Sequence, residues 1–263
     1  MKAGTEILLK ENLKVLNLSH MSANLGSLLR QARENGTSYE EFLLAITEVE
    51  LQMRAENRLK RKLREAKFPL LKTLEQFDYS SVPGLDKRLM RELETGEYLR
   101  SHRNIIFTGK SGTGKTHLAT GLGVAACGQG ISTRFVNGCG LSNELIEAQT
   151  ERRLSRVIQK YARYGLVVID ELGYVPFSKE SAELLFQVLA ERHERGSVII
   201  TTNLGFADWT QVFGDATLTA ALLDRLTHKA HIISCTWESY RLKETLRTRR
   251  ESSKGPADNR VSS

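Results

Sequence analysis

The stretch "GKSGTGKT" at residues 109–116 decides the fold of this chain. It matches the pattern G-x-x-x-x-G-K-[ST], in which glycines let the backbone curl closely around phosphate groups. The β-rich run "NIIFT" (104–108) precedes it, and a helical pattern follows it. A loop between a strand and a helix points its N–H groups and the positive end of the helix dipole toward an anion. The sequence therefore predicts a phosphate-binding loop, and the alternative is a glycine-rich turn without a ligand.

The predicted loop and the first helical turn after it supply eight consecutive residues for binding: Gly109, Lys110, Ser111, Gly112, Thr113, Gly114, Lys115 and Thr116. Lys115 is expected to reach the β- and γ-phosphates of a nucleotide, and the Thr116 hydroxyl to complete the coordination shell of Mg²⁺. The predicted ligands are therefore a nucleoside triphosphate and Mg²⁺.

A second element, "LVVIDE" (166–171), places two carboxylates after a run of four apolar residues. Asp170 ends this predicted buried strand, where it can hold Mg²⁺ through water, and Glu171 is placed to polarise an attacking water. In the alternative interpretation the two carboxylates only begin a following helix. Together with the phosphate loop, the pair favours hydrolysis of the nucleotide.

Three further side chains fit the same chemistry. Asn203 ends "IITTN" and could orient the water near the γ-phosphate, although Asn is also common where a strand enters a turn. Arg225 in "LLDRL" and Arg241 in "ESYR" could stabilise charge on a phosphoryl group in transfer, because a guanidinium is always charged and offers a fixed fork of donors. Either arginine could instead pair with a surface carboxylate.

Short β-rich runs alternate with helical patterns over the central part of the chain. The runs are "NIIFT" (104–108), "STRFVN" (132–137), "LVVID" (166–170), "SVIITT" (197–202) and "HIISC" (231–235). Strands separated by helices need crossover connections, which are typical of a parallel sheet. We therefore predict an α/β fold with a mostly parallel, doubly wound sheet.

The N-terminal part shows a helical pattern over residues 6–67, with apolar residues recurring every three or four positions. "NGTSYEEF" (35–42) interrupts it, because Asn-Gly favours a turn and Ser38 with Glu41 fits a capping box. The next helix ends in "RLKRKLREAK" (58–67), which holds six basic residues and one acidic residue. This cluster predicts contact with DNA or an acidic partner, or else it only complements the helix dipole.

These patterns divide the chain into three parts. We predict a helical N-terminal domain at residues 1–68, a core domain at residues 69–250 and a disordered tail at residues 251–263, where the sequence is polar and aperiodic.

The net charge of +7 is confined to the two ends of the chain. Residues 1–68 carry 12 basic and 9 acidic side chains, residues 241–263 carry 7 and 3, and the region between them is balanced. This distribution favours contact with a polyanion such as nucleic acid, and the alternative is charge that only solvates the surface. No apolar run is long enough for a membrane span and the three cysteines show no metal or disulfide spacing, so we expect a cytoplasmic protein with no membrane contact.

In chain order the motifs GKSGTGKT, LVVIDE, TTN, LLDRL and WESYR resemble those of the AAA+ ATPases of the initiator clade. The closer resemblance is to the IstB-like transposition helper ATPases, with the DnaC-type helicase loaders as near relatives. It covers about residues 5–247 and is carried by "REAKFPLLKTLEQFDYS", "GTGKTHLA", "IDELGYVPF", "ALLDRLTHKAHII" and "ESYRLK". The resemblance implies an AAA+ P-loop NTPase core preceded by a small all-α domain.

The resemblance also implies roles at matching positions. ATP and Mg²⁺ are the implied cofactors, Asn203 takes the sensor-1 role, and adenine is expected near "FDYS" (77–80). Arg225 resembles the arginine finger that reaches into a neighbouring subunit's nucleotide, and Arg241 resembles the sensor-2 arginine of its own subunit. Because such a finger completes the site only at a subunit interface, we expect a homo-oligomer, either a ring or a helical filament, that forms with ATP.

Members of this clade carry a helical insertion after the second strand, and residues 140–165 occupy that place. The residues expected to contact DNA there are Arg152, Arg153, Arg156 and Lys160. Their spacing predicts one basic helix face, which would follow the phosphate backbone of duplex DNA without reading bases. In the alternative, the face is only solvated and Glu147 and Glu151 pair with part of it.

The predicted function is that of a DNA-dependent ATPase that oligomerises on double-stranded DNA with little sequence preference and assists a cognate transposase in target-site selection and insertion. The sequence "DELGYVPF" (170–177) favours this hypothesis over a replicative helicase loader of the DnaC type. Two further alternatives are a phosphotransferase acting on a small molecule and an ATP-gated scaffold whose hydrolysis is incidental.

Overall fold

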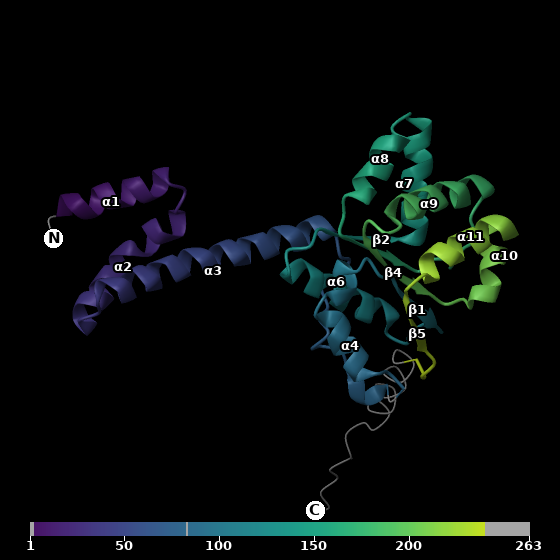
Figure 1. The fold of residues 1–263 in the computed structure, drawn as a ribbon, viewed down its shortest axis with the longest axis horizontal. Coiled ribbons are helices and arrows are strands. Elements are labelled where there is room, and N and C mark those ends of the chain that lie inside the picture. Colours follow the sequence, from purple (N-terminus) through teal and green to yellow (C-terminus); the bar gives the residue numbers. More distant parts are fainter. Residues whose placement is uncertain (1–2, 83, 240–263) are drawn as a thin grey trace, which may run out of the picture. The chain divides into compact units, whose positions relative to one another are not determined.

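The structure is a computed structural model that describes residues 3–82 and 84–239 (Figure 1). It divides into two compact units, one up to Arg61 and the other from Lys62 onward. The domain boundary expected near residue 68 stays a prediction, and the expected tail lies outside the described residues. No helix among the described residues is both long enough and apolar enough to cross a membrane.

The first unit consists of α1 (Ala3–Val15), α2 (Ser19–Asn35) and most of α3, whose full extent is Tyr39–Ala66. Its buried apolar residues are Leu13, Leu25 and Ile46. The predicted turn is confirmed, because Gly36 ends α2 in a left-handed conformation with φ of 62°. The capping box is confirmed as well: the Ser38 N–H donates to Glu41 Oε2 at 2.9 Å, and the Glu41 N–H donates to Ser38 Oγ at 3.3 Å.

Helix α2 receives its N-terminal cap from a distant residue. Leu18 precedes the helix and offers no side-chain hydrogen bond, while Glu50 of α3 accepts from the His20 and Met21 N–H groups, each at 2.9 Å. Arg54 Nε donates to the other oxygen of Glu50 at 2.7 Å. A buried carboxylate thus satisfies free N–H groups at the positive end of a helix dipole.

We predict that Glu50→Gln destabilises the first unit by about 1–3 kcal/mol, because charge-assisted hydrogen bonds become neutral ones. Burial acts to raise the pKa of Glu50, but the hydrogen bonds from Met21, Arg54 and His20 outweigh it and the pKa lies below its ordinary 4.5. A lowered pKa in the folded state means that the stabilisation is complete above pH 4.5 and is lost as the pH falls through the folded value.

Hydrogen exchange of α2 checks this prediction. The variant should exchange faster than wild type at pH 7, and the difference should vanish in acid well below pH 4.5. Glu48→Gln is the matched control, because it changes an exposed carboxylate of α3, the helix that also carries Glu50. Equal exchange of α2 in wild type and Glu50→Gln at pH 7 would contradict the assigned capping role.

The second unit is built on a five-stranded sheet. Its strands are β1 (Ile105–Gly109), β2 (Thr133–Asn137), β3 (Leu166–Asp170), β4 (Ser197–Thr202) and β5 (His231–Cys235). Their order is β2-β3-β4-β1-β5 and all neighbouring pairs are parallel. The five predicted strands and the parallel sheet are confirmed.

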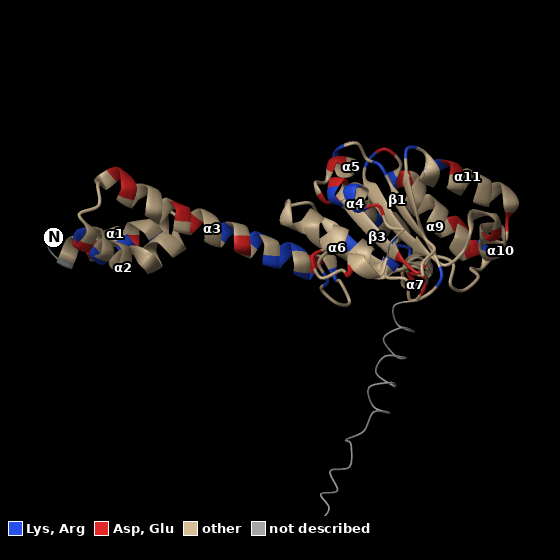
Figure 2. Cartoon of the chain, turned by 90° about the horizontal axis from the view of Figure 1, so that it is seen from below, with Lys and Arg blue, Asp and Glu red and all other residues tan. Residues whose placement is uncertain are grey.

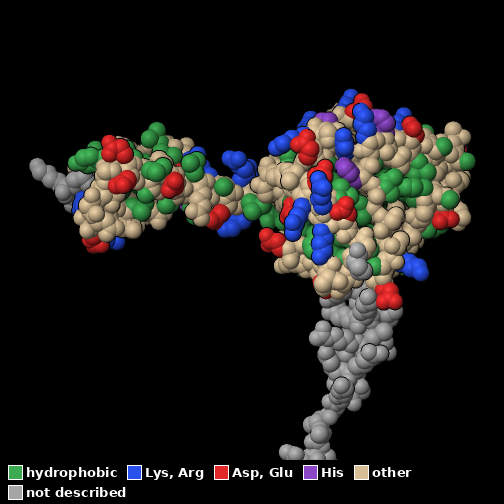
Figure 3. Space-filling model, turned by 60° about the horizontal axis from the view of Figure 1, so that its bottom comes forward, with side chains coloured by type: hydrophobic (Ala, Val, Ile, Leu, Met, Phe, Trp, Pro, Cys, Tyr) green, Lys and Arg blue, Asp and Glu red, His purple; other side chains and the backbone are tan. Residues whose placement is uncertain are grey.

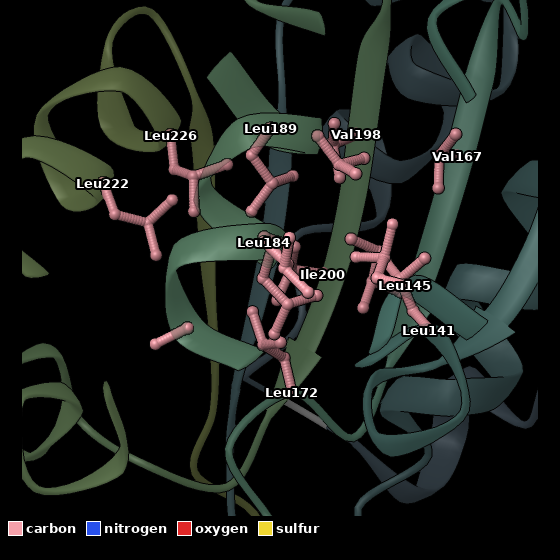
Figure 4. Close-up of a cluster of buried hydrophobic side chains, with 14 of the residues drawn as sticks. Leu141, Leu145, Val167, Leu172, Leu184, Leu189, Val198, Ile200, Leu222 and Leu226 are labelled. Atoms are coloured by element: carbon pink, nitrogen blue, oxygen red, sulfur yellow. The ribbon is translucent and has the colours of Figure 1, made fainter. Parts of the chain in front are cut away.

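Helices cover both faces of the sheet, because successive strand residues point to opposite sides. Ile105, Phe107 and Val168 pack in one layer with α4 (Lys87–Glu94) and α6 (Lys115–Gly128). The opposite layer contains Ile106, Val167, Ile169 and Ile200 and is partly drawn in Figure 4. Its helices are α7 (Gly138–Thr150), α8 (Leu154–Ala162), α9 (Lys179–Arg192), α10 (Trp209–Phe213) and α11 (Ala216–Thr227). The doubly wound arrangement is therefore confirmed, and a short helix α5 (Glu97–Arg100) precedes β1.

The strand order positions the site. β1 lies between β4 and β5, whereas β2 and β3 lie beyond β4, so the order reverses next to β1. Ligands of open parallel sheets bind at such a reversal, outside the carboxyl ends of the strands. Gly109, Asp170 and Thr202 end β1, β3 and β4, so this edge brings the predicted motifs together.

Candidate phosphate-binding site

The phosphate loop runs from the end of β1 to the start of α6, and its glycines are required by its geometry. Gly109, Gly112 and Gly114 have φ of 140°, 80° and 89°. A Cβ on Gly109 would lie 2.2 Å from the carbonyl oxygen of Cys235, and a Cβ on Gly114 would lie 2.8 Å from the ring of Phe77. Larger residues would both strain the backbone and displace these neighbours.

Lys115 lies beneath the loop. Its Nζ donates to the carbonyl oxygens of Gly109 at 2.6 Å and Lys110 at 2.8 Å, and the residue is 9% exposed. These bonds hold the ammonium group inside the curve of the loop, where phosphate oxygens would meet it.

The magnesium ligands expected from the sequence lie together. Thr116 Oγ1 donates to Asp170 Oδ1 at 2.9 Å, and Thr201 Oγ1 donates to the same oxygen at 2.6 Å. Hydroxyl and carboxylate oxygens are the donors that Mg²⁺ prefers, so the residues present fit this ion. Thr201 was not identified from the sequence, although it lies one residue before the end of the neighbouring predicted strand.

The charge state of Asp170 supports the same fit. Burial raises the pKa of its carboxyl group above the ordinary value, and the neighbouring Glu171 carboxylate adds to the rise. Hydrogen bonds from Thr201 and Thr116 and the ammonium of Lys115 act in the opposite direction but do not cancel it. A buried carboxylate with a raised pKa gains from a nearby cation.

Glu171 follows β3 in a left-handed conformation with φ of 55°. Its N–H donates to Thr201 Oγ1 at 2.9 Å, which fixes the turn, and its carboxylate accepts from Asn137 Nδ2 at 3.0 Å. Asn137 ends β2, and its Oδ1 accepts from the Cys139 N–H at 3.0 Å to cap α7. Sequence reasoning missed Asn137, although its place at the end of "RFVN" on the same sheet edge was a usable signal.

A cavity of about 660 Å³ adjoins the loop. Its lining includes residues 111–117, Glu171 and residues 201–203, together with the apolar side chains of Leu70 and Phe77. This volume and mixed lining are typical of sites for a nucleotide-sized ligand. Phe77 and Asp78 line it, so the expected position of adenine near residues 77–80 is compatible with the cavity and stays a prediction.

Trp237 contacts the loop from the segment after β5. Its Nε1 donates to the carbonyl oxygen of Thr113 at 2.8 Å, although the two residues lie 124 positions apart. Trp237 begins the motif WESYR, but the sequence assigned no role to it. The bond fixes the orientation of a peptide group within the phosphate loop, so Trp237 is a positioning residue of the site.

We predict that Trp237→Phe weakens nucleotide binding by about fivefold to tenfold, because the ring is kept but one hydrogen bond to the loop is lost. Titration with a fluorescent ATP analogue checks the dissociation constant, and the rate at saturating nucleotide should change little. Trp209→Phe is the matched control, since Trp209 is buried in the opposite layer. An unchanged dissociation constant in Trp237→Phe would remove this role.

The remaining predicted catalytic residues differ in where they lie. Asn203 follows β4 and lines the cavity. Arg225 of α11 is absent from the cavity lining; its guanidinium lies 4.5 Å from the ring centroid of Phe186, and its Nη1 is buried without a hydrogen-bond partner among the described residues. Arg241 lies outside the described residues.

The prediction of one basic helix face in the insertion is wrong. Helix α7 ends at Thr150 and α8 begins at Leu154, so Arg152 and Arg153 lie between two helices. The Arg153 N–H bonds to the Ala148 carbonyl and the Arg152 N–H to the Gln149 carbonyl, with φ of 56° at Arg152. This hydrogen-bond pattern ends a helix, and glycine usually occupies the position that Arg152 has here. Because the sequence has no glycine at this position, it gave no sign that α7 ends there.

The four basic residues also differ in their partners. Arg153 forms ion pairs with Glu147 and Glu151, and Lys160 pairs with Glu144 at 3.0 Å. Arg152 and Arg156 are exposed and form no ion pair with any other described residue. The charge available for a polyanion in the insertion therefore includes Arg152 and Arg156.

Comparisons with known proteins place this site in a family. A family model described as "IstB-like ATP binding protein" matches residues 11–248. The chain is 40% identical over 229 residues to the insertion sequence IS21 putative ATP-binding protein of Pseudomonas aeruginosa, covering 87% of this chain and 86% of that protein. It is 37% identical over 236 residues to the insertion sequence IS232 putative ATP-binding protein of Bacillus thuringiensis subsp. berliner, with 90% and 94% covered.

Among solved structures, AMPPCP-bound DnaA from Aquifex aeolicus is similar with a TM-score of 0.55 at 15% identity. The match covers 73% of this chain and 58% of that chain. At this identity the likeness shows a shared AAA+ P-loop fold. The resemblance expected from the motifs is confirmed.

Proposed function

Because the chain belongs to the family of IstB-like ATP-binding proteins, we propose that it is a Mg²⁺-dependent ATPase that assembles on duplex DNA and assists a transposase in target-site selection and insertion. The observation that carries the ATPase part is that Lys115, Thr116 and Glu171 line one cavity next to the phosphate loop and that Asp170 accepts a hydrogen bond from Thr116. The relatives named above belong to insertion sequences, which supports a transposase as the partner.

Each site residue has a separate role in the proposed hydrolysis. The loop N–H groups and Lys115 bind the phosphates, and Thr116 with Asp170 would hold Mg²⁺, which supplies positive charge to the triphosphate. Glu171 accepts a proton from the attacking water, whose position Asn203 fixes. Arg225 does not line the nucleotide cavity of its own chain, which fits a role in the nucleotide site of a neighbouring copy.

DNA binding is supported by the unpaired arginines of the insertion. Arg152 and Arg156 can contact phosphate oxygens without first giving up an ion pair, whereas Arg153 and Lys160 already have acidic partners. Figure 2 shows further Lys and Arg residues along the last turns of α3, which form a second basic segment. Contacts of this kind depend on salt and not on base sequence.

The experiment that tests the proposal measures binding to fluorescent duplex DNA by anisotropy, with and without ATP. We expect ATP to promote assembly on DNA with little sequence preference and a steep salt dependence. The double variant Arg152→Glu/Arg156→Glu should weaken binding at least about tenfold and lower the salt slope by roughly one for each lost phosphate contact.

The double variant Arg88→Glu/Arg91→Glu is the matched control, because it makes the same charge change on exposed residues of α4, in the opposite layer of the fold. Equal losses in both double variants would show a general charge effect and contradict the proposed contact. Absence of any ATP effect on DNA assembly would overturn the proposal. Pull-down of the transposase from the same element, against pull-down of a replicative helicase, separates the transposition role from helicase loading.

A further inference from the structure

Two histidines and a glutamate lie together at the edge of the sheet opposite the phosphate loop. His193 and Glu194 follow α9 and precede β4, while His228 follows α11 and precedes β5. One ligand atom from each of the three side chains lies within 4.8 Å of the other two, and the imidazole centroids are 5.9 Å apart. Histidine side chains at the surface of this unit are visible in Figure 3.

The backbone holds these three residues in place. The His193 N–H donates to the Ala190 carbonyl at 3.2 Å, and the His228 N–H donates to the Asp224 carbonyl at 3.0 Å. Glu194 has φ of 59°, a conformation fixed by the tight turn between α9 and β4. Helices α9 and α11 also pack against each other in the core layer of Figure 4, so the two turns are held side by side.

The three side chains are available for a ligand. Within residues 3–82 and 84–239, none of them forms a hydrogen bond or an ion pair. The adjacent cation Arg195 is already paired with Glu191. Two imidazoles and a carboxylate without other partners are a donor set for Zn²⁺ and related transition metals, whereas Mg²⁺ and Ca²⁺ prefer oxygen ligands alone.

We propose that His193, Glu194 and His228 form a site for a divalent transition metal, with water in the remaining position. The site is separate from the magnesium ligands, which lie at the other edge of the sheet. An ion there joins the end of α9 to the end of α11. Because α11 carries Arg225, which stacks on Phe186 of α9, the ion stabilises the pair of helices that positions this arginine.

Zn²⁺ titration of the untagged full chain against a chromogenic chelator tests the site. Cys139→Ser is included in every protein, since Cys139 is the described cysteine that is not buried. We expect one Zn²⁺ per chain. The Zn²⁺ affinity of His228→Asn should be at least about tenfold lower than that of wild type, because loss of an outer-shell partner costs about 10- to 100-fold and His228 is a proposed direct ligand. Glu194→Gln, which keeps the size of the side chain, should also weaken binding.

His102→Asn is the matched control, because it removes an exposed histidine that is not part of the cluster. Co²⁺ in place of Zn²⁺ gives a second readout, as its visible absorption should appear in wild type and be lost in His228→Asn. Zn²⁺ should raise the Tm of wild type and of His102→Asn but not that of His228→Asn. Equal Zn²⁺ affinity in wild type and His228→Asn, or an equal loss in His102→Asn, overturns the proposal.

Discussion

Glu171→Gln should bind ATP with unchanged affinity and hydrolyse it at least about 100-fold more slowly than wild type. An amide of the same size cannot accept a proton from the attacking water. It can still accept the hydrogen bond from Asn137, and the backbone bond to Thr201 is unaffected, so the turn after β3 is kept. Phosphate release at saturating ATP, with duplex DNA present, measures the effect.

The same variant distinguishes an ATPase that needs hydrolysis for its function from an ATP-gated scaffold whose hydrolysis is incidental. If hydrolysis ends the assembled state, Glu171→Gln should stay on DNA with ATP long after wild type has dissociated, which sedimentation can follow. Glu180→Gln, an exposed carboxylate in the first turn of α9, should behave as wild type. Wild-type turnover in Glu171→Gln would assign the base to another residue, and transposition at the wild-type level with hydrolysis blocked would favour the scaffold.

The carboxyl ends of the strands show what local sequence can determine. Each strand was identified from a short β-rich run, and the motifs assigned Thr116 and Asp170 to one Mg²⁺ site. The two side chains are in contact because parallel strands place their carboxyl ends at one edge. Glu171 and Asn203 reach the same cavity for the same reason. Residues that end strands could therefore be assigned to the site before any geometry was known.

Contacts between distant segments could not be predicted in this way. Trp237 meets Thr113 because β5 lies beside β1, and Glu50 caps α2 because α3 folds back on it. Arg192 is 1% exposed, and its guanidinium donates to the carbonyls of Tyr164 and Ser197, each at 2.8 Å. Burial lowers the pKa of Arg192 to about 10, and in the sequence this residue looks like an ordinary cation at a helix end.

The insertion shows how a periodic pattern can mislead. Four-residue spacing of cations suggested one helix, but the chain reverses at Arg152 without glycine or proline to mark the turn. A left-handed arginine costs backbone free energy, which the two hydrogen bonds of the helix end and the packing of Val157 and Tyr161 in the core offset. Tertiary packing therefore decided a boundary that local propensity did not indicate.

Arg225→Ala should lower ATP turnover by about 10³-fold or more in the assembled protein, because an arginine finger stabilises the negative charge on the phosphoryl group during its transfer. The ATP affinity of the isolated chain should change little, since Arg225 is absent from the lining of its own cavity. Loss of the stacking on Phe186 should cost only about 0.5–1 kcal/mol of stability, so the variant should fold. Arg225→Lys should also be impaired, because lysine keeps the charge but loses the planar fork of donors.

Mixing two inactive variants tests whether the arginine acts on a neighbouring copy. Lys115→Ala lacks a working phosphate loop but keeps Arg225, whereas Arg225→Ala keeps the loop and lacks the arginine. In a head-to-tail assembly, an equal mixture should form intact sites at about a quarter of its interfaces, so turnover should rise well above that of either variant alone. A mixture as inactive as its components would argue against a shared site, and wild-type turnover by Arg225→Ala as a monomer would exclude it.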